Sequence, residues 1–543
     1  MSDASPVDAV IVGAGPNGLA AAVAIAREGY SVTVLEAAPT IGGGTRTEEL
    51  TIPGLLHDVC SAVHPFGVAS PFFSTLPLAD HGLVWCHAPV DVAHPLDGGR
   101  VAVMVRSLDD TVAGLGSDGP AWRRTFGRLA SGFPELAGDI MRPIIHVPDH
   151  PLRLARFGAT ALRPASLVAR RWKREETRGL FGGIAAHVIH PLGRPTTTAP
   201  ALALAAACHA VGWPVARGGS RTITDALASL LRHHGGTIET GVRVGSLAEL
   251  PPHRVALFDV TPRAFVRIAG DAVLRRVRRA YLRYRHGPAA FKVDLAVEGG
   301  VPWTAESARR AGTVHVGGTF EQIATAEREV HAGRVPARPF VLVAQQHVAD
   351  PTRSRGDVHP IWAYAHVPNG YAGDASEAIL DQVERFAPGL RERIVGRRVM
   401  GPAAFESYNA NYIGGDISTG ANDPLQLVVR PRLAMDPYST GIRGVYLCSA
   451  ATPPGAGVHG MCGAGAAVSA LRLLRTLRPL SVGRRTAGFQ AGCLGRQPWR
   501  ATRATAAAAR SSRPDAPPSA RQRRRGRRSH RGTPSQHPAC RRP

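Results

Sequence analysis

The sequence predicts an α/β fold built around a parallel sheet, with an inserted α+β domain. Three stretches carry this prediction, because in each of them β-branched strands alternate with a helix. The expected strands are residues 7–12, 31–35, 237–240, 242–244, 255–260 and 444–450, and the expected helices are residues 19–28, 222–233 and 464–477. Strands that alternate with helices in this way are typical of a parallel sheet.

The turn after the first strand is a dinucleotide-binding fingerprint. Gly13, Gly15 and Gly18 form a GxGxxG pattern between a strand and a helix. In that context Gly13 permits the tight turn, Gly15 lets the backbone approach a pyrophosphate, and Gly18 lets the helix pack on the strand. Pro16 suits the first helical turn, whose free N–H groups hold the phosphates. Glu36 ends the second strand, where its carboxylate is placed to accept the hydroxyls of an adenosine ribose.

A second glycine cluster follows the acidic residue. Residues 41–47 read IGGGTRT, and Arg46 supplies a fixed positive charge there. A unit that binds only NAD has no need of this loop, whereas in flavoproteins such a loop returns to the pyrophosphate and the ribityl chain. The alternative is a flexible surface loop, because glycine clusters are common turn signals.

The C-terminal stretch carries a third glycine-rich turn. Residues 455–460 (GAGVHG) lie between a strand and a helix and also fit GxGxxG formally. A second nucleotide unit requires an acid about 20 residues further on, but residues 461–483 contain no Asp or Glu. We therefore expect this turn to serve the same ligand, with the electropositive helix start facing a ribityl hydroxyl or the pyrimidine end of a flavin.

The segments between these stretches predict a mixed second domain. Its expected strands are residues 288–300, 312–321 and 338–366, and its expected helices are residues 181–190, 201–212 and 377–386. The region over 140–200 is expected to be irregular and partly helical. The longest apolar run, residues 199–215, is broken by two prolines and is too short to span a bilayer. We expect a buried helix there, with a membrane-dipping segment as the alternative.

The net charge of +24 does not indicate a nucleic-acid-binding body. From Arg484 onward, 16 arginines and one aspartate supply 15 of these charges. Lys173 and Lys292 are the only lysines, so the excess is of arginine as such, which is typical of a GC-rich coding sequence. The body shows no basic stripe interleaved with aromatics. For residues 484–543 we expect disorder; a basic arm and a frameshift artefact are the alternatives, of which we favour the artefact.

Cysteine usage and the N-terminus indicate a reducing compartment. The 7 cysteines are scattered without a CxxC pair, unlike a disulfide framework or a dithiol site. We expect no metal site, because no ligand spacing for one occurs. The chain enters its first strand without a basic and apolar leader, so we expect no signal peptide and a cytoplasmic protein.

Together these motifs resemble the phytoene-desaturase-like FAD-dependent oxidoreductases. The fingerprint with Glu36, the 42–47 loop, the Gly218-Gly219…Gly235-Gly236 segment and residues 446–465 all match. The similarity is closer to the pyridine nucleotide-disulfide oxidoreductase domain-containing subgroup. The stretches that carry it are Phe291–Asp294 with Val301–Trp303, Gly312–His315, Trp362–Pro368, Asn409–Ile417 and Pro453–Gly463.

The resemblance implies a discontinuous FAD domain and an inserted substrate domain. The FAD domain takes residues 1–75, 214–260 and 425–483, and the substrate domain takes residues 76–213 and 261–424. The implied activity is hydride transfer between flavin and a C–C bond of an apolar, isoprenoid- or carotenoid-like molecule. Such enzymes are cytosolic or peripheral at membranes. An amine-oxidase-like enzyme and a non-catalytic FAD-binding interaction protein are the alternatives.

Candidate site residues follow from the motifs and the resemblance. The predicted cofactor contacts are Gly13, Gly15, Pro16, Asn17, Gly18, Glu36, Gly43, Gly44, Thr45, Arg46, Val244, Ser449, Gly457, Val458 and His459. The catalytic candidates are His459, His64 and Asn411, with Asp416 beside them. For each of these side chains the alternative is a hydrogen bond that only fixes a loop. Trp303, Trp362 and Tyr364 are expected in the core rather than around a substrate.

Overall fold

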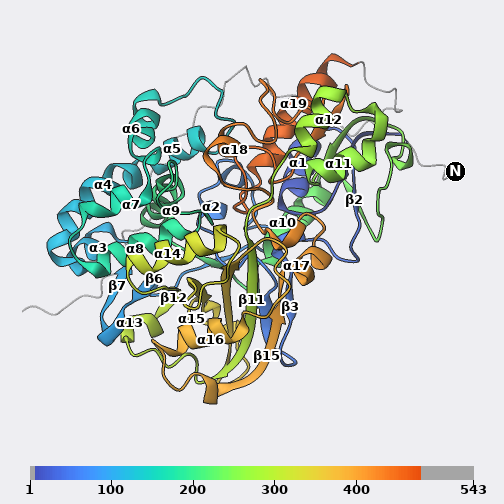
Figure 1. The fold of residues 1–543 in the computed structure, drawn as a ribbon. Helices are drawn as coiled ribbons and strands as arrows, with labels where there is room; N and C mark the ends of the chain where they lie inside the picture. The colour runs from blue at the N-terminus through green and yellow to red at the C-terminus, as the bar shows by residue number, and fades with distance from the viewer. Residues whose placement is uncertain (1–5, 478–543) are drawn as a thin grey trace, which may run out of the picture. The chain divides into compact units, whose positions relative to one another are not determined.

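The computed structural model describes residues 6–477, and the predictions for residues 484–543 lie outside that range. No helix within the described range is both long and apolar enough to cross a membrane. The described residues contain two main sheets, each with its own hydrophobic core (Figure 1).

The first sheet is parallel and holds the nucleotide fingerprint. Its strands are β1 (Val7–Val12), β2 (Val32–Glu36), β9 (Thr237–Thr240), β10 (His253–Phe258) and β16 (Val445–Leu447). They pair in the order β16-β10-β1-β2-β9, with Ala9 of β1 opposite Val32 on one side and Val255 on the other. Because every pairing is parallel, the carboxyl ends of all five strands meet at one edge.

Helices cover both faces of this sheet. Three of them bury apolar stripes against one face: α1 (Pro16–Ala26), α10 (Arg221–His233) and α19 (Met461–Thr476). Leu227 of α10 packs there with Ile11 and Leu257, all fully buried. On the other face lie α11 (Pro262–Ala269) and α12 (Arg275–Leu282) (Figure 1). They bury Phe265 and Tyr281 there. These two helices belong in sequence to the predicted substrate segment but pack on the nucleotide sheet.

The second sheet is mixed and has two different faces. Its strands are β6 (Val90–Pro95), β7 (Val101–Met104), β11 (Ala289–Glu298), β12 (Ala311–Val316), β13 (Val341–Ala344), β14 (Val358–Val367) and β15 (Ile394–Met400). They run in the order β15-β11-β14-β13-β12-β6-β7, antiparallel except for β12 with β6. Alternation along β11 puts Val293 in an apolar cluster on one face, while Lys292 and Asp294 fall on the other face.

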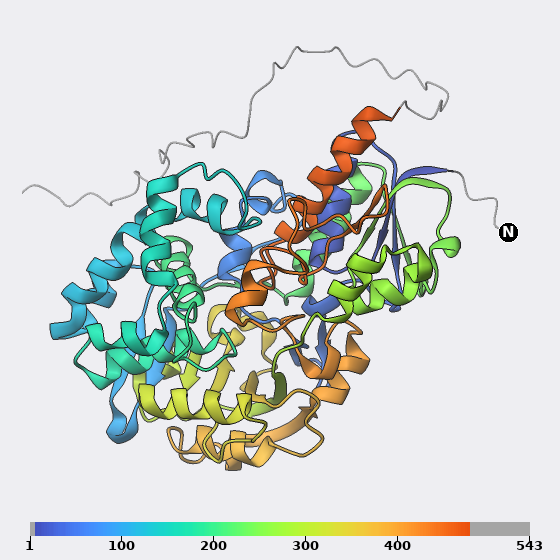
Figure 2. The same cartoon turned by 45° about the horizontal axis from the view of Figure 1, so that its top comes forward.

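A layer of helices packs beside that polar face (Figure 2). Its members are α3 (Leu108–Gly114), α4 (Gly119–Ser131), α5 (Phe133–Ile140), α6 (Pro151–Ala161), α7 (Ala165–Val168), α8 (Glu175–Ala186) and α9 (Thr198–Val211). Residues 201–208 of α9 are all buried, so the apolar run is a core helix as expected. Trp303, Trp362 and Tyr364 are also buried in core clusters.

Short elements complete the described chain. The strands β3 (Thr47–Glu49) and β4 (Leu56–Asp58) form a hairpin. The strands β5 (Trp85–Cys86) and β8 (Val215–Ala216), distant in sequence, form a second antiparallel pair. The remaining helices are α2 (Pro65–Val68), α13 (Glu306–Arg309), α14 (Phe320–His331), α15 (Gln346–Ala349), α16 (Ser376–Glu384), α17 (Pro402–Tyr408) and α18 (Pro424–Val428).

Several predicted strands are shorter or absent. Residues 242–244 are irregular, because Gly241 turns the chain at φ 75° after β9. The strand predicted over 312–321 ends at Val316, since Gly318 turns at φ 71° and Thr319 begins the capping box of α14. The strand over 338–366 is split into β13 and β14 by α15. The strand over 444–450 is only β16, and α6 lies in the region over 140–200 expected to be irregular and partly helical.

Candidate cofactor and active site

Two glycine loops meet at the carboxyl edge of the nucleotide sheet. Gly13 has φ 105°, and a Cβ added to Gly18 would lie 2.0 Å from the Gly13 carbonyl oxygen, so helix α1 can approach the turn only at glycine. The Gly42 N–H donates to the Ala14 carbonyl oxygen at 3.0 Å. A Cβ on Gly43 would lie 3.0 Å from the Gly15 Cα. The two loops predicted to contact one pyrophosphate are therefore in direct contact with each other.

Glu36 is buried where the sequence places it, at the end of β2. Its carboxylate accepts the Ala14 N–H at 2.7 Å and the Ala38 N–H at 2.9 Å. Arg46 lies 3.7 Å from that carboxylate and is itself fixed by Thr40. A carboxylate oxygen accepts more than one hydrogen bond, so Glu36 retains capacity for ribose hydroxyls.

Val244 closes the same end of the sheet from the other face. Although it is not in a strand, its side chain is buried in one cluster with Leu35 and Phe258. The backbone before it is held against the end of β2, because the Val242 N–H donates to the Glu36 carbonyl oxygen at 2.9 Å. Val244 thus lies at the predicted adenosine end of the site.

The third glycine turn is brought to the first by helix packing. A Cβ on Gly463 would lie 1.8 Å from the Asn17 carbonyl oxygen, so the first turns of α19 and α1 pack against each other. The turn before α19 is strained, with Val458 at φ 53° between Gly457 and the helix. Ser449 ties the end of β16 to β10 through its hydroxyl, which donates to the Val260 carbonyl oxygen at 2.7 Å. The N-termini of α1 and α19 therefore lie next to each other, beside the glycine turns.

The residues at this edge fit a long dinucleotide. Glycines allow close approach to the backbone, helix starts would present N–H groups to phosphates, and Glu36 lies at the predicted ribose position. The Oδ1 atom of Asn17, in the first turn of α1, is buried and has no hydrogen-bond partner among the described residues. A ligand hydroxyl or water at this position would satisfy it. The predicted contacts from Gly13 to Arg46 and from Ser449 to His459 thus flank one region.

His459 is held by its own turn. Its Nδ1 accepts the Met461 N–H at 3.1 Å, and the carbonyls of Gly455 and Ala456 lie by the ring. Burial lowers the pKa of His459 to about 4 against the raising effect of those carbonyls. A neutral, hydrogen-bonded imidazole in this position fixes the turn that precedes α19.

His64 has a ring nitrogen with no hydrogen-bond partner among the described residues. Its Nε2 is 2.8 Å from the Ser220 hydroxyl, which donates to the Ser61 carbonyl oxygen at 2.7 Å. Its Nδ1 is buried and unpaired within the described residues. Burial lowers the pKa of His64 to about 4, although the Asp58 carboxylate acts to raise it. His64 is therefore a neutral imidazole with one free lone pair.

Asn411 lies at the glycine-loop end rather than in a separate catalytic cluster. Its Oδ1 accepts the Thr261 N–H at 3.0 Å, and its Nδ2 donates to the Asp259 carbonyl oxygen at 2.9 Å. Nearby, the Tyr408 hydroxyl donates to the Gly43 carbonyl oxygen at 2.7 Å. The segment that ends α17 thus covers the predicted pyrophosphate loops. Asp416 is a turn residue, accepting three backbone N–H groups that include those of Gly287 and Gly420.

Sequence reasoning missed a buried ionic network beside this segment. Lys292 donates to both carboxylate oxygens of Asp294 at 2.5 and 2.6 Å and to the Asp58 carbonyl oxygen at 2.9 Å. Burial would raise the pKa of Asp58, but Arg353 at 3.0 Å and the N–H of Ser220 hold it below its usual range. The sequence could have pointed to Lys292, because it is one of only two lysines and interrupts an apolar strand.

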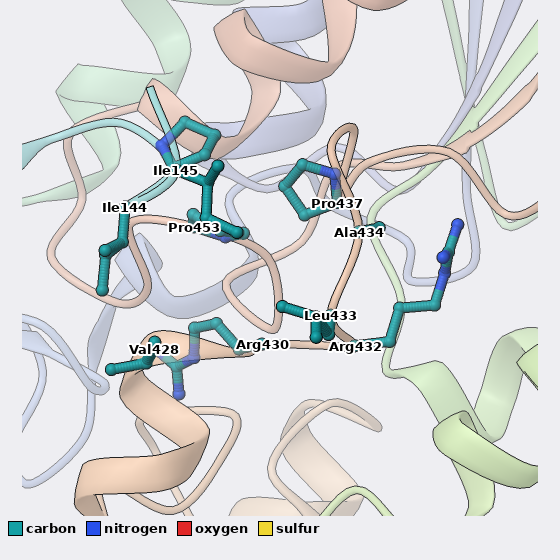
Figure 3. Close-up of a pocket in the computed structure, with 10 residues that line it drawn as sticks. Ile144, Ile145, Val428, Arg430, Arg432, Leu433, Ala434, Pro437 and Pro453 are labelled. Carbon is teal, nitrogen blue, oxygen red and sulfur yellow. The ribbon is translucent and has the colours of Figure 1, made fainter. Parts of the chain in front are cut away.

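A narrow cleft, lined by apolar side chains and by Arg430 and Arg432, opens beside the turn that leads to α19. Figure 3 shows Ile144 and Ile145 on one side, Val428 and Leu433 on the other, and Pro453 beside Ile145. The side chain of Arg430 lies at the inner end, where a Cβ on Gly455 would be 2.3 Å from its Nη1. The rim is exposed, with Leu433 at 69% and Ile144 at 56% exposure.

Comparisons with known proteins find a matching family model and relatives among oxidoreductases. Residues 11–75 match the family model described as an NAD(P)-binding Rossmann-like domain. The chain is 24% identical to pyridine nucleotide-disulfide oxidoreductase domain-containing protein 2 of Rattus norvegicus, over 87% of this chain and 94% of that protein. It is 28% identical to hydroxyneurosporene desaturase of Cereibacter sphaeroides, over 44% of this chain and 50% of that protein.

Solved structures share the fold at low identity. An oxidoreductase from Methanosarcina mazei matches with a TM-score of 0.55 and 15% identity, over 86% of this chain and all of that chain. Putrescine oxidase matches with a TM-score of 0.55 and 18% identity, over 87% and 99% of the two chains. Cyclohexylamine oxidase from Brevibacterium oxydans matches with a TM-score of 0.54 and 16% identity, with the same coverage.

These findings confirm the α/β fold with a Rossmann-type domain, and they confirm the resemblance to phytoene-desaturase-like and pyridine nucleotide-disulfide oxidoreductase domain-containing proteins. The predicted enzyme class and cofactor agree with them: the chain has the fold of an FAD-dependent oxidoreductase.

Proposed function

We propose that the chain transfers hydride between FAD and a C–C bond of an apolar, isoprenoid- or carotenoid-like small molecule. The observation that carries the proposal is the convergence of the α1 and α19 N-termini at one sheet edge. This convergence suits a dinucleotide cofactor. The relative hydroxyneurosporene desaturase carries a name of the same substrate class.

The chain's own residues would hold and orient the cofactor. The loops around Gly15 and Gly43 would receive the pyrophosphate, Glu36 the adenosine ribose, and the start of α19 the ribityl and ring end. When bound, the flavin supplies the hydride acceptor or donor. His459 keeps the turn before α19 in place through its bond with the Met461 N–H.

A desaturation releases a proton as well as a hydride. Of the predicted catalytic residues, His64 offers a buried lone pair, on Nδ1, that has no partner among the described residues. We assign proton acceptance to that atom, and Ser220 holds the ring through its bond to Nε2. With its pKa at about 4, His64 is neutral at pH 7 and is ready to accept a proton, though it is a weak base.

We also propose peripheral contact with a lipid surface at the cleft rim. Val147 is 87% exposed and Met435 is 82% exposed, and both lie close in sequence to rim residues. Exposed apolar residues gathered at a cleft mark binding surfaces. Cosedimentation with phosphatidylcholine vesicles tests this: binding that Leu433→Ser weakens supports the contact, and equal recovery of both proteins in the supernatant contradicts it.

Amine oxidation is the second candidate. It is favoured by the fold shared with putrescine oxidase and cyclohexylamine oxidase. An aromatic pair facing the cofactor would support it, but Trp362 and Tyr364, whose ring centroids are 4.9 Å apart, are buried in a core cluster. The Lys292 ammonium lies 5.7 Å from the Trp362 ring centroid and already occupies that face. A second cation there would meet like charge.

Turnover separates the candidates. The purified chain is photoreduced and then mixed in turn with a polyene, a quinone and oxygen, and the oxidised protein is mixed with primary amines. Reoxidation by the polyene, or extraction of an apolar molecule that copurifies, supports the proposal. Bleaching of the flavin by amines alone supports amine oxidation. A flavin that responds to none of these reagents contradicts both enzyme functions and supports a non-catalytic FAD-binding role.

A further inference from the structure

A carboxylate lies inside the glycine-rich turn. Asp259 directly follows β10, and its Oδ2 accepts the Gly18 N–H at 3.0 Å. A Cβ added to Gly15 would lie 2.9 Å from the same oxygen, and one added to Gly13 would lie 3.0 Å from the Asp259 Cβ. The Gly18 N–H is one of the first-turn donors of α1, which have no partner within the helix. An anionic side chain thus occupies a donor that the fingerprint offers to phosphate.

The position of this carboxyl is fixed by the backbone around it. The Asp259 N–H donates to the Val12 carbonyl oxygen at 2.8 Å, continuing the register between β1 and β10. The Asp259 carbonyl oxygen accepts Asn411 Nδ2, and Asn411 Oδ1 accepts the Thr261 N–H. Because these hydrogen bonds hold the Asp259 backbone on both sides, the carboxylate can move away from the Gly18 N–H only by rotation about its side-chain bonds.

The titratable groups facing Asp259 are acidic or neutral. Glu36 approaches from β2, Cys448 from β16 and Cys462 from α19. Burial raises the pKa of Asp259 to about 7, and the Glu36 charge adds to this, whereas the Gly18 hydrogen bond lowers it. In the part of the chain that the structure describes, Arg46 is paired with Glu36 rather than with Asp259. The carboxyl therefore changes its charge near neutral pH.

We propose that Asp259 competes with the cofactor pyrophosphate for the first turn of α1, so that FAD binds together with a proton on Asp259. The inference rests on the proposed FAD function. Two anions at one N–H donor repel each other in a partly buried site, which favours the neutral form of the side chain. Once protonated, the Asp259 hydroxyl can donate a hydrogen bond to a phosphate oxygen instead of opposing it.

The sign of the pH effect follows from this exchange. Binding takes up one proton, so affinity is highest when Asp259 is already protonated in the free chain. Above pH 7 the free chain loses that proton, and the dissociation constant for FAD rises by up to about tenfold for each pH unit. Below pH 6 the dissociation constant levels off.

The test titrates FAD into the full-length apoprotein from pH 6 to pH 9, following flavin fluorescence at constant ionic strength. The wild-type dissociation constant is expected to rise steeply above pH 7. Asp259→Asn keeps the shape of the side chain without its charge, so its dissociation constant is expected to be flat and lower than that of the wild type at pH 8. Asp225→Asn, an exposed change of the same charge on α10, is the matched control and is expected to keep the wild-type slope.

Three results would overturn the inference, and only one of them would also overturn the proposed FAD function. A flat wild-type profile overturns it while leaving FAD binding intact. Weaker binding by Asp259→Asn at every pH, with an unchanged circular dichroism spectrum, shows that the carboxylate holds the cofactor and also overturns it. Failure of the wild type to bind FAD at any pH overturns the proposed function, and the inference with it.

Discussion

Glu36 shows how one side chain can serve both fold and ligand. It joins the ends of β1 and β2 through the N–H groups of Ala14 and Ala38, and its remaining acceptor capacity faces the predicted ribose. Its identity was predictable, because an acid at the end of the second strand is part of the fingerprint. The backbone bonds that orient it depend on the Gly13 turn and were not predictable from spacing.

Replacing this carboxylate is expected to weaken FAD binding. Glu36→Gln removes the charge, and the loss of a charge-assisted hydrogen bond costs about 1.5–3 kcal/mol, or about 10- to 150-fold in the dissociation constant. Fluorescence titration measures it. Glu239→Gln, at an exposed position on neighbouring β9, is the control and should bind as the wild type does. If Glu36→Gln and the wild type bound FAD with equal affinity, this would contradict a contact between Glu36 and the ribose.

His64 is the residue whose chemical role is most open to test. His64→Gln keeps a donor to Ser220 but removes the Nδ1 lone pair, so proton acceptance should be lost. General-base catalysis contributes about 10²–10⁴-fold, and the rate of flavin reoxidation or reduction with the polyene is expected to fall within that range. His81→Gln is the control, since His81 bonds Ser229 at 2.8 Å in the same way at a part-buried site.

A structural role for His64 predicts a different result. In that case His64→Gln would lower the melting temperature and leave the pH dependence of turnover unchanged. A fall in rate that disappears when the protein is cooled well below its melting temperature would therefore contradict proton acceptance.

At the level of elements, some helices and strands were predictable from the local sequence pattern and others were not. β1, α1, β2, α10 and α19 were predictable within a few residues, because each has a clear apolar period and a glycine or proline at its boundary. The strands over 312–321 and 338–366 were wrong in part, since Gly318 and the short helix α15 interrupt runs that look continuous. No local signal marks which strands share a sheet.

The candidate site was predictable only where one motif covers it. The loops around Gly15 and Gly43, which lie in contact, were predicted from their glycine-rich motifs. Asp259 and Lys292 were not found, because their roles come from residues far away in sequence: Asp259 reaches Gly18, and Lys292 reaches Asp58. The position of Asp259 directly after a parallel strand, at the ligand-binding edge, is the signal that could have identified it.

The ion pair between Lys292 and Asp294, on the polar face of β11, is expected to contribute to the stability of the fold. Lys292→Met leaves the Asp294 carboxylate buried without its cation, and breaking such a pair costs about 3–5 kcal/mol. Urea unfolding is expected to show this loss. The double variant Lys292→Met/Asp294→Leu removes both charges and is expected to recover most of it. A single variant as stable as the wild type would mean that the pair carries no stability.

At the scale of the whole molecule, buried histidines make the fold sensitive to acid. Burial lowers the pKa of His64, His94, His209 and His459 to about 4, below the ordinary value of 6.5. Between pH 6.5 and 4 the unfolded chain binds protons that the folded chain does not, so stability falls as the pH falls. Each histidine contributes up to about 1.4 kcal/mol per pH unit in that window.

Calorimetry across pH measures this dependence. The melting temperature is expected to be nearly constant from pH 8 to pH 7 and to drop steadily from pH 6.5 to pH 4.5. A constant melting temperature down to pH 5 would contradict neutral burial of these side chains. His233→Gln, on an exposed residue, should leave the profile unchanged and serves as the control.

The central claim is that three glycine turns, distant in sequence, form one FAD site. The measurement that tests it most directly is the stoichiometry of flavin released on heat denaturation of the purified, FAD-saturated chain. The account predicts one FAD per chain for the wild type and almost none for Gly15→Val, whose side chain would fill the pyrophosphate approach. A wild-type protein that releases no flavin, or a Gly15→Val protein that retains a full equivalent, would contradict it.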